Sequence, residues 1–348
     1  MKKRILSIML VSLMFVFAGS SAFAAWTQPK GYAYNQLTVG YYVTDEKYTT
    51  LQLDSDGVVT GFPVDNHKVP SAKFSSTKIT YYGEYGITDK LTIYTSIPYD
   101  WQRSDDTMRY AAEDGPYGVG DINLGIRHSL IDNIAGTGVL MSFQGEVKIP
   151  EAYDCGLITT HLSLGDCQYD ATVALLFGRG LGKGYAWLNT GYKFRFENDE
   201  FDPATFTPSD QIKISFGGGY AVTSWLSIRG IVDWTRSVGN AKVSPALLAL
   251  DWPTGGSASN GDYVLVKDTL GLEPHALSVG IDLAFNVSKY LTFMKDTFPN
   301  KEIVISYNTE IEGWDPFETE NFSRGETFNV AFVFPGEGFF PVNLFSRK

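Results

Sequence analysis

Long apolar runs are absent from this chain beyond its first residues. From Ala25 onward, no stretch approaches the ~18 consecutive apolar residues that a membrane helix needs. Apolar residues still make up 44% of the sequence, and they alternate with polar ones. This pattern excludes a helical membrane protein. A closed barrel of strands, the other structure that can span a membrane, remains compatible with it.

Residues suited to catalysis or metal binding are scarce. The sequence has four histidines and two cysteines, and no His/Cys cluster has the spacing of a metal site. His161-Leu162-Ser163 resembles the His-x-Ser of outer-membrane phospholipases, but the stretch around Leu175 and Leu176 has no Asn to orient the base. We therefore expect no enzymatic activity, no catalytic residue, no metal and no cofactor.

Asp54-Ser55-Asp56-Gly57 has the appearance of a calcium-binding loop. Such a loop needs further oxygen ligands and a bidentate Glu downstream, and none is placed here. A hairpin turn between two short strands is the favoured interpretation.

The N-terminus has the three parts of a secretory signal peptide. A basic start, Lys2-Lys3-Arg4, precedes an apolar stretch over residues 5–18, and Ala22-Phe23-Ala24 fits a cleavage site. We expect cleavage after Ala24, with residues 1–24 as the signal.

The formal net charge of −11 argues against a nucleic-acid partner.

Both cysteines, Cys155 and Cys167, fall in one long polar segment. In an oxidising compartment such a pair forms a disulfide by default. The bridge would either shape a surface loop near a pore mouth or only shorten that loop.

The spacing between turn-like breaks alternates long and short along the chain. Thr88-Asp89-Lys90, residues 180–183 and Thr223-Ser224-Trp225 are tight connections between stretches of alternating polarity. Short turns on one side of the membrane and long loops on the other are typical of bacterial outer-membrane barrels. The long polar segments are residues 45–72, 102–117, 151–167, 198–209, 239–272 and 313–324.

About twelve antiparallel strands are predicted, an even number as in single-chain bacterial barrels. Each has one apolar and one polar face, and the polar face must point inward. The predicted fold class is an all-β transmembrane up-and-down barrel over residues 25–334. The strands are expected at residues 32–44, 74–87, 90–102, 118–131, 137–150, 168–179, 184–197, 209–222, 225–238, 274–288, 301–312 and 325–334.

The last predicted strand ends with apolar residues at every second position and a terminal Phe334. This matches the assembly signal of outer-membrane barrels, so we expect the barrel-assembly machinery, outer-membrane lipid and lipopolysaccharide as partners. Pro335 and Gly336 should end the strand. Residues 335–348 then form a periplasmic tail; the alternative is a tail folded into the barrel.

Two segments resemble a known family. Residues 84–93 read EYGITDKLTI and residues 118–127 read GVGDINLGIR. Both look like the outer-membrane barrel family labelled "MetA-pathway of phenol degradation", a group assigned to transport. The resemblance implies passage of small molecules, aromatic or hydrophobic ones among them, through the outer membrane.

The inward face carries charges that must be paired or hydrated. Opposed rings of charge are one way in which a pore selects solutes. We therefore hypothesise that the selectivity residues are Lys193, Arg195, Lys213 and Arg229, facing Asp100, Asp121 and Glu146.

Two functions from different classes fit these features. The first is an outer-membrane channel for passive diffusion of small molecules, which the charged lumen favours. The alternative is a non-conducting structural barrel whose extracellular loops bind a partner or an exported polymer, which the loop lengths favour. A lumen filled by salt bridges would support this alternative. A barrel of about twelve strands is only just wide enough for an open lumen, so side chains could fill it.

Overall fold

The computed structural model describes residues 25–53, 59–61, 65–104, 115–154, 163–200, 203–249, 271–291 and 300–337. Within these ranges, no helix has the length and apolar character needed to cross a membrane.

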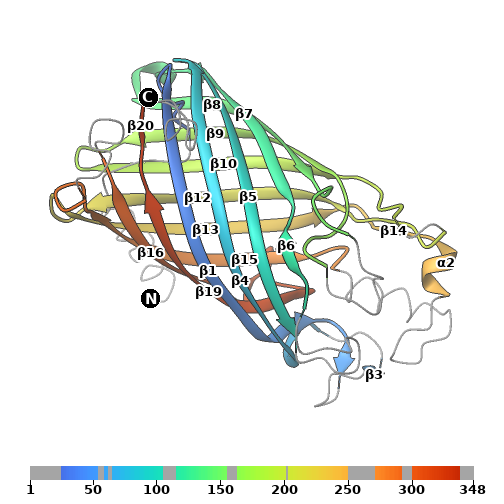
Figure 1. The fold of residues 1–348 in the computed structure, drawn as a ribbon. Helices are drawn as coiled ribbons and strands as arrows, with labels where there is room; N and C mark the ends of the chain where they lie inside the picture. The colour runs from blue at the N-terminus through green and yellow to red at the C-terminus, as the bar shows by residue number, and fades with distance from the viewer. Residues whose placement is uncertain are drawn as a thin grey trace, which may run out of the picture.

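Twelve long strands form a closed antiparallel barrel in which each strand pairs with its neighbours along the chain (Figure 1). The last strand pairs with the first, with Val39 opposite Val330, so the wall has no free edge. The predicted fold class is confirmed. In order, the wall strands are β1 (Tyr32–Thr49), β4 (His67–Thr88), β5 (Leu91–Ser104), β7 (Ile122–Ile131), β8 (Val139–Ile149), β9 (Asp170–Gly180), β10 (Gly184–Arg195), β12 (Asp210–Ala221), β13 (Leu226–Val238), β15 (His275–Asn286), β16 (Glu302–Glu310) and β19 (Phe322–Val333).

The two ends of the barrel differ in their connections. β4 ends at Thr88 and β5 begins at Leu91, while β9 ends at Gly180 and β10 begins at Gly184. These tight connections lie where the sequence predicted them. We call this the short-turn end and the opposite one the long-loop end.

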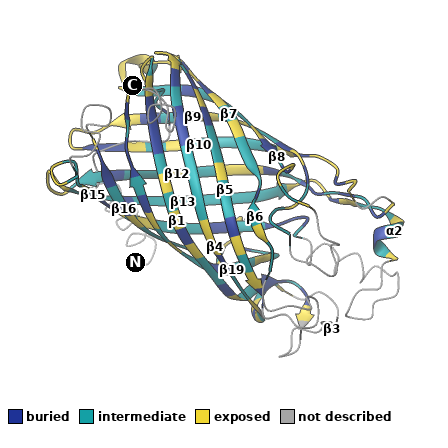
Figure 2. Cartoon of the chain, in the orientation of Figure 1, coloured by how far each residue is buried: buried dark blue, intermediate teal, exposed yellow. Residues whose placement is uncertain are grey.

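Exposed residues alternate with less exposed ones along the wall strands (Figure 2), and the exposed ones include many large apolar residues. On β1, the Val39 side chain is 51% exposed, and Leu188 and Phe194 of β10 are likewise exposed. Glu84 and Arg127, by contrast, are buried inside the barrel. This distribution is the reverse of a soluble barrel and agrees with the predicted inward polar face.

The first hairpin is longer than predicted. The predicted loop over residues 45–72 is wrong in part, because β1 continues to Thr49 and β4 already begins at His67. A register shift after Thr44 lets the hairpin continue beyond a bulge. Glu46 there accepts from Lys68 Nζ at 2.9 Å and from Arg324 Nη1 at 2.7 Å.

Several loop segments at the long-loop end have structure of their own. β2 (Gln52–Leu53) pairs with β3 (Val59–Gly61), which agrees with the predicted short hairpin, although residues 54–58 lie outside the described ranges. Segment 239–272 is not all loop: it contains β14 (Lys242–Val243) and α2 (Pro245–Leu248), and β14 pairs with β11 (Phe206–Thr207). A small apolar cluster, the loop cluster, consists of Ala204, Phe206, Ala241, Leu247 and Leu272.

The chain after the last strand turns back onto the first. β19 ends at Val333, and Phe334 N then donates to Asn35 O at 2.9 Å. β20 (Gly336–Glu337) pairs with Tyr32 and Ala33. Residues 338–348, most of the predicted tail, lie outside the described ranges.

Candidate functional site: the barrel lumen

Two adjoining cavities occupy the lumen. The central cavity has a volume of about 510 Å³ and the outer cavity about 450 Å³. Both are lined by Thr38 and Thr80, so they meet at that part of the wall. The outer cavity lies toward the long-loop end, where Ser163 and Leu164 contribute to its lining.

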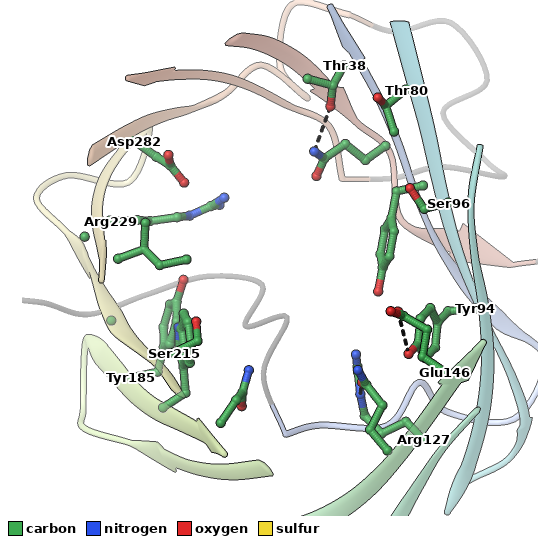
Figure 3. A pocket seen from close by; sticks show the side chains of 18 residues that line it. Thr38, Thr80, Tyr94, Ser96, Arg127, Glu146, Tyr185, Ser215, Arg229 and Asp282 are labelled. Atoms are coloured by element: carbon green, nitrogen blue, oxygen red, sulfur yellow. Dashed lines mark hydrogen bonds between the residues drawn. The ribbon is translucent and has the colours of Figure 1, made fainter. Parts of the chain in front are cut away.

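Aromatic and charged side chains together line the central cavity (Figure 3). Tyr82 and Tyr94 come from β4 and β5, and their ring centroids are 6.2 Å apart. Tyr185 and Trp187 of β10 line the cavity as well. The cavity can therefore offer both ring faces and polar groups to a small molecule.

Arg127 and Glu84 form a buried ion pair on one side of the central cavity. Their side chains are 3% and 2% exposed, and Arg127 Nη1 lies 3.0 Å from Glu84 Oε1. Tyr82 Oη also donates to Glu84 at 2.6 Å, and Arg127 Nε donates to Gln144 Oε1 at 3.0 Å. These additional hydrogen bonds satisfy the charged groups, as a buried pair requires.

A second ion pair lies between β13 and β16. Arg229 Nη2 donates to Glu302 Oε2 at 2.6 Å. Arg229 lines the central cavity, while Glu302 lines a third cavity of about 340 Å³ beside the turn at Thr223, the inner cavity. The pair therefore stands between the central cavity and the short-turn end.

Residues 25–31, the N-terminal segment, enter the barrel at the short-turn end: Ala25 is buried, while Pro29 and Lys30 are exposed beside the turn at Asp89. Arg127 Nη1 donates to Trp26 O at 3.1 Å, and Gln28 Nε2 donates to Glu84 Oε2 at 2.7 Å. The Trp26 ring meets Tyr185 edge-on at 6.3 Å. The segment therefore narrows the lumen, a feature that the sequence analysis did not predict.

Glycines make room for the N-terminal segment. A Cβ on Gly86 would lie 2.1 Å from Pro29 O, and one on Gly178 would lie 2.7 Å from the Trp26 ring. Only a residue without a side chain permits such close approach. Glycines at these two positions are a sequence signal that another segment approaches the strands closely. The sequence does not show which segment that is.

Charged residues of β8, β9 and β10, together with Asp121 and Asp166 outside the strands, form a network toward the long-loop end. Lys148 Nζ lies 2.9 Å from Asp170 Oδ2 and 3.5 Å from Asp121 Oδ2. Lys193 Nζ lies 2.6 Å from the same Asp170 oxygen. The complete set, which we call the outer network, is Lys148, Lys193, Arg195, Asp121, Asp166 and Asp170.

Asp166 holds residues 163–168, the inward segment, against the wall. It pairs with Lys148 and lies 3.5 Å from Arg195 Nη2. Asn198 Nδ2 also donates to Asp166 O at 3.1 Å. Because Ser163, Leu164 and Gly165 line the outer cavity, this segment narrows the lumen at the long-loop end.

Tyr153 connects the inward segment to the wall. Its Oη donates to Asp121 Oδ1 at 2.7 Å and accepts from Cys167 N at 3.0 Å. Burial, together with the hydrogen bond to the Asp121 carboxylate, raises the pKa of Tyr153. The disulfide between Cys155 and Cys167 stays a prediction, because Cys155 lies outside the described residues.

The structure brings only some of the hypothesised selectivity residues together. Lys193, Arg195 and Asp121 share the outer network, but the two cations bond directly to Asp170 and Asp166 instead of facing acids across an open lumen. Neither aspartate was among the predicted selectivity residues; Asp166 lies in the inward segment and Asp170 beside it. Their pairing with the basic patch depends on how that segment folds.

The remaining selectivity candidates lie apart. Asp100 lines the outer cavity 3.4 Å from Lys78 Nζ, and Glu146 lines the central cavity, where Tyr94 Oη donates to it at 3.0 Å. Arg229 is bonded to Glu302, and Lys213 is an exposed residue of β12. The His161-Leu162-Ser163 motif, which resembles that of outer-membrane phospholipases, cannot be followed in the structure because His161 and Leu162 lie outside the described residues.

Solved structures are similar to this barrel, although no family model and no curated protein matches the sequence. The COG4313 outer membrane channel from Pseudomonas putida F1 is 16% identical, with a TM-score of 0.62 over 91% of this chain and 100% of that one. A Pseudomonas aeruginosa FadL homologue is 10% identical, with a TM-score of 0.38 over 88% of this chain and 90% of that one. The P. putida toluene transporter TodX is 11% identical, with a TM-score of 0.36 over 89% and 91%.

The first of these likenesses covers the whole barrel. It agrees with the resemblance of residues 84–93 and 118–127 to a family of outer-membrane transporters. The chain therefore has the fold of an outer-membrane channel: a closed antiparallel barrel of twelve strands.

Proposed function

We propose that the protein is an outer-membrane channel through which small molecules diffuse passively. The observation that carries this proposal is a closed wall, apolar outside, around adjoining cavities lined by polar and charged groups. Such a wall suits lipid on its outer face and water or solute within. The fold shared with an outer-membrane channel supports the same function.

The route would run from the outer cavity through the central cavity to the inner cavity. The inward segment narrows its start. The Arg229–Glu302 pair and the N-terminal segment narrow its end. A solute would therefore meet several weak sites in series, as conduction requires.

Aromatic and hydrophobic compounds are among the solutes that we propose. Tyr82, Tyr94, Tyr185 and Trp187 give the central cavity aromatic surface between its polar groups. Ligand sites commonly combine apolar walls with a few polar groups that fix orientation.

The proposal also covers how the protein is exported and how the barrel is inserted into the outer membrane. Residues 1–24 would direct the chain across the inner membrane and be removed. The alternating apolar residues that end at Phe334 would engage the barrel-assembly machinery. The exposed apolar side chains of the wall, such as Val39 and Leu188, would contact outer-membrane lipid and lipopolysaccharide.

Single-channel recording of the refolded protein in a planar bilayer tests the proposal. We expect discrete, repeatable current steps, and swelling of liposomes that contain the protein when small solutes are added. Silence from a barrel that is folded, as judged by heat-modifiable mobility on a gel, would contradict the channel.

The alternative is a structural barrel whose loops bind a partner or an exported polymer. The loop cluster favours it, because Phe206, Leu247 and Leu272 build a small core outside the wall. Deleting residues 240–270 removes Ala241 and Leu247 from this cluster and separates the two functions. A scaffold should lose binding, whereas a channel should keep its conductance.

A further inference from the structure

Carboxylates outnumber cations around the central cavity. Arg127 is bonded to Glu84, and Arg229 is bonded to Glu302. Two further carboxylates line the cavity, Glu146 on β8 and Asp282 on β15. Each arginine is thus already neutralised by one carboxylate, and Glu146 and Asp282 remain as excess negative charge.

Neither Glu146 nor Asp282 forms an ion pair among the described residues. Glu146 accepts a hydrogen bond from Tyr94 Oη at 3.0 Å, which is a neutral donor. Asp282 stands opposite Arg229 in the β13–β15 register, but the guanidinium of Arg229 is directed to Glu302. Figure 3 shows the two carboxylates on opposite walls, with open space between them.

Aromatic rings complete the cavity wall. Tyr94 lies beside Glu146, and Tyr185 and Trp187 lie on the facing strand β10. The face of an aromatic ring attracts an ammonium group, and a carboxylate pairs with it directly. The volume of about 510 Å³ is within the range of small-molecule sites.

We propose that the central cavity binds organic cations, in the form of a protonated amine on a small aromatic or aliphatic body. This proposal deepens the proposed function, since it names a solute class for the channel. The ammonium group pairs with Glu146 or Asp282, and the apolar body packs against Tyr94, Tyr185 or Trp187.

An organic anion does not fit this cavity equally well. To reach Arg127 it must replace Glu84, whose carboxylate also accepts from Tyr82 and Gln28. Breaking a buried ion pair leaves an uncompensated charge. Among the residues that line the central cavity, an anion therefore meets two carboxylates without an ion pair, and both arginines are already paired.

Calorimetric titration of the refolded full chain in detergent tests the site. The probes are phenethylammonium, 2-phenylethanol and phenylacetate, which share one aromatic body and differ in charge. We expect phenethylammonium to bind and the other two to bind far more weakly. Glu146→Gln and Asp282→Asn should each weaken binding of phenethylammonium by about tenfold, the scale of one lost charged hydrogen bond.

The matched control is Asp132→Asn, which removes a carboxylate that is 73% exposed at a short turn and pairs with Lys90 outside the cavity. Its affinity for phenethylammonium should not change. Equal or tighter binding of phenylacetate by the unaltered protein overturns the proposal, even where a variant fails to fold. Unchanged affinity in both folded cavity variants overturns it as well.

Binding in detergent needs no conduction, so the two proposals can fail separately. If a barrel that conducts no current binds phenethylammonium, the proposed binding site is supported and the proposed channel function is refuted. If the protein gives current steps but does not bind phenethylammonium, the channel function is supported and the proposed binding site is refuted.

Discussion

At the scale of single residues, the barrel keeps charge inside and apolar surface outside. Glu84, Arg127 and Arg229 are buried but bonded, and Val39 is exposed on the outer face. Burying a charge costs free energy unless an opposite charge and hydrogen bonds compensate it. The pairs in the lumen therefore restrict which single substitutions the barrel tolerates.

Replacing Arg127 by methionine should destabilise the barrel. Glu84, whose side chain is 2% exposed, would lose its cation, and losing one partner of a buried pair costs about 3–5 kcal/mol. Urea unfolding in lipid vesicles measures the change. The double variant Arg127→Met/Glu84→Gln should recover much of the loss; no recovery would show that Arg127 stabilises the barrel through other contacts.

Lys193→Ala/Arg195→Ala should shift ion selectivity toward cations. The substitutions leave Asp170 and Asp166 without these two partners, so the outer mouth becomes more negative. Reversal potentials across a salt gradient measure the shift. Lys90→Ala, at an exposed short turn, serves as the control. Unchanged reversal potentials would discard the hypothesis that the basic patch selects ions.

At the scale of elements, two segments outside the wall strands fold into the lumen. The N-terminal segment binds beside Arg127 at the short-turn end, and the inward segment binds Lys148 at the long-loop end. Wall side chains hold both segments, and the N-terminal segment also bonds through its backbone, where Gly31 N donates to Gly86 O at 2.8 Å. We therefore expect the N-terminal segment to limit conduction at the short-turn end and the inward segment to limit it at the long-loop end.

Deleting residues 26–29 should raise the single-channel conductance. These residues include Trp26, which packs against Tyr185, and Gln28, which bonds to Glu84. Their removal opens the short-turn end of the lumen. Trp26→Ala should have a smaller effect of the same sign, and Trp314→Ala, at a loop position that is 67% exposed, should have none. A folded deletion variant with unchanged conductance would contradict the constriction.

Asp166→Asn should shift selectivity toward anions, opposite in sign to the lysine and arginine variant. The substitution removes one carboxylate and weakens the hold of Lys148 and Arg195 on the inward segment. We also expect larger current fluctuations, because the segment is held less firmly. Asp154→Asn, an exposed neighbour, is the control. A recording indistinguishable from that of the unaltered protein would rule out this anchoring role.

At the scale of the whole molecule, closure of the sheet and inversion of its faces adapt the chain to a membrane. Pairing of β19 with β1 removes the free edges that lipid cannot satisfy. Exposed apolar side chains appear on strands all around the wall, among them Val39, Leu188 and Ile281.

Ile281→Arg should destabilise the protein in lipid vesicles. Ile281 is 51% exposed on the outer face of β15, and an arginine facing the bilayer midplane costs about 2–4 kcal/mol in such barrels. Equilibrium unfolding from vesicles measures the cost. Ser224→Arg, at an exposed short turn, is the control. Equal stability of the two variants would show that β15 does not face lipid.

Strand positions could be predicted because their signals are local. Alternation identifies each face, and residues such as those around Asp89 and Ser224 mark tight turns. The extension of β1 and β4 beyond Thr44 and Phe74 escaped prediction. There Glu46, Lys47 and Lys68 replace apolar residues, so no alternation appears, and the pairing becomes evident only in the hairpin itself.

The candidate site was predicted less completely. The sequence placed Lys193, Arg195 and Glu146 on the inner face. Glu146 lines the central cavity, while Lys193 and Arg195 pair with Asp170 and Asp166. It did not identify Asp166 and Asp170 as their partners, nor Trp26 as a residue of the lumen.

The sequence alone determined the number and order of the wall strands and which face of each is polar. Those properties depend on residues two apart and on turns of a few residues. Only the tertiary structure decided what fills the lumen and which charges pair there. Gln28 meets Glu84 because the N-terminal segment enters the lumen, and Arg229 meets Glu302 because β13 and β16 both pair with β15. The two pairs join residues that lie 56 and 73 positions apart in the chain.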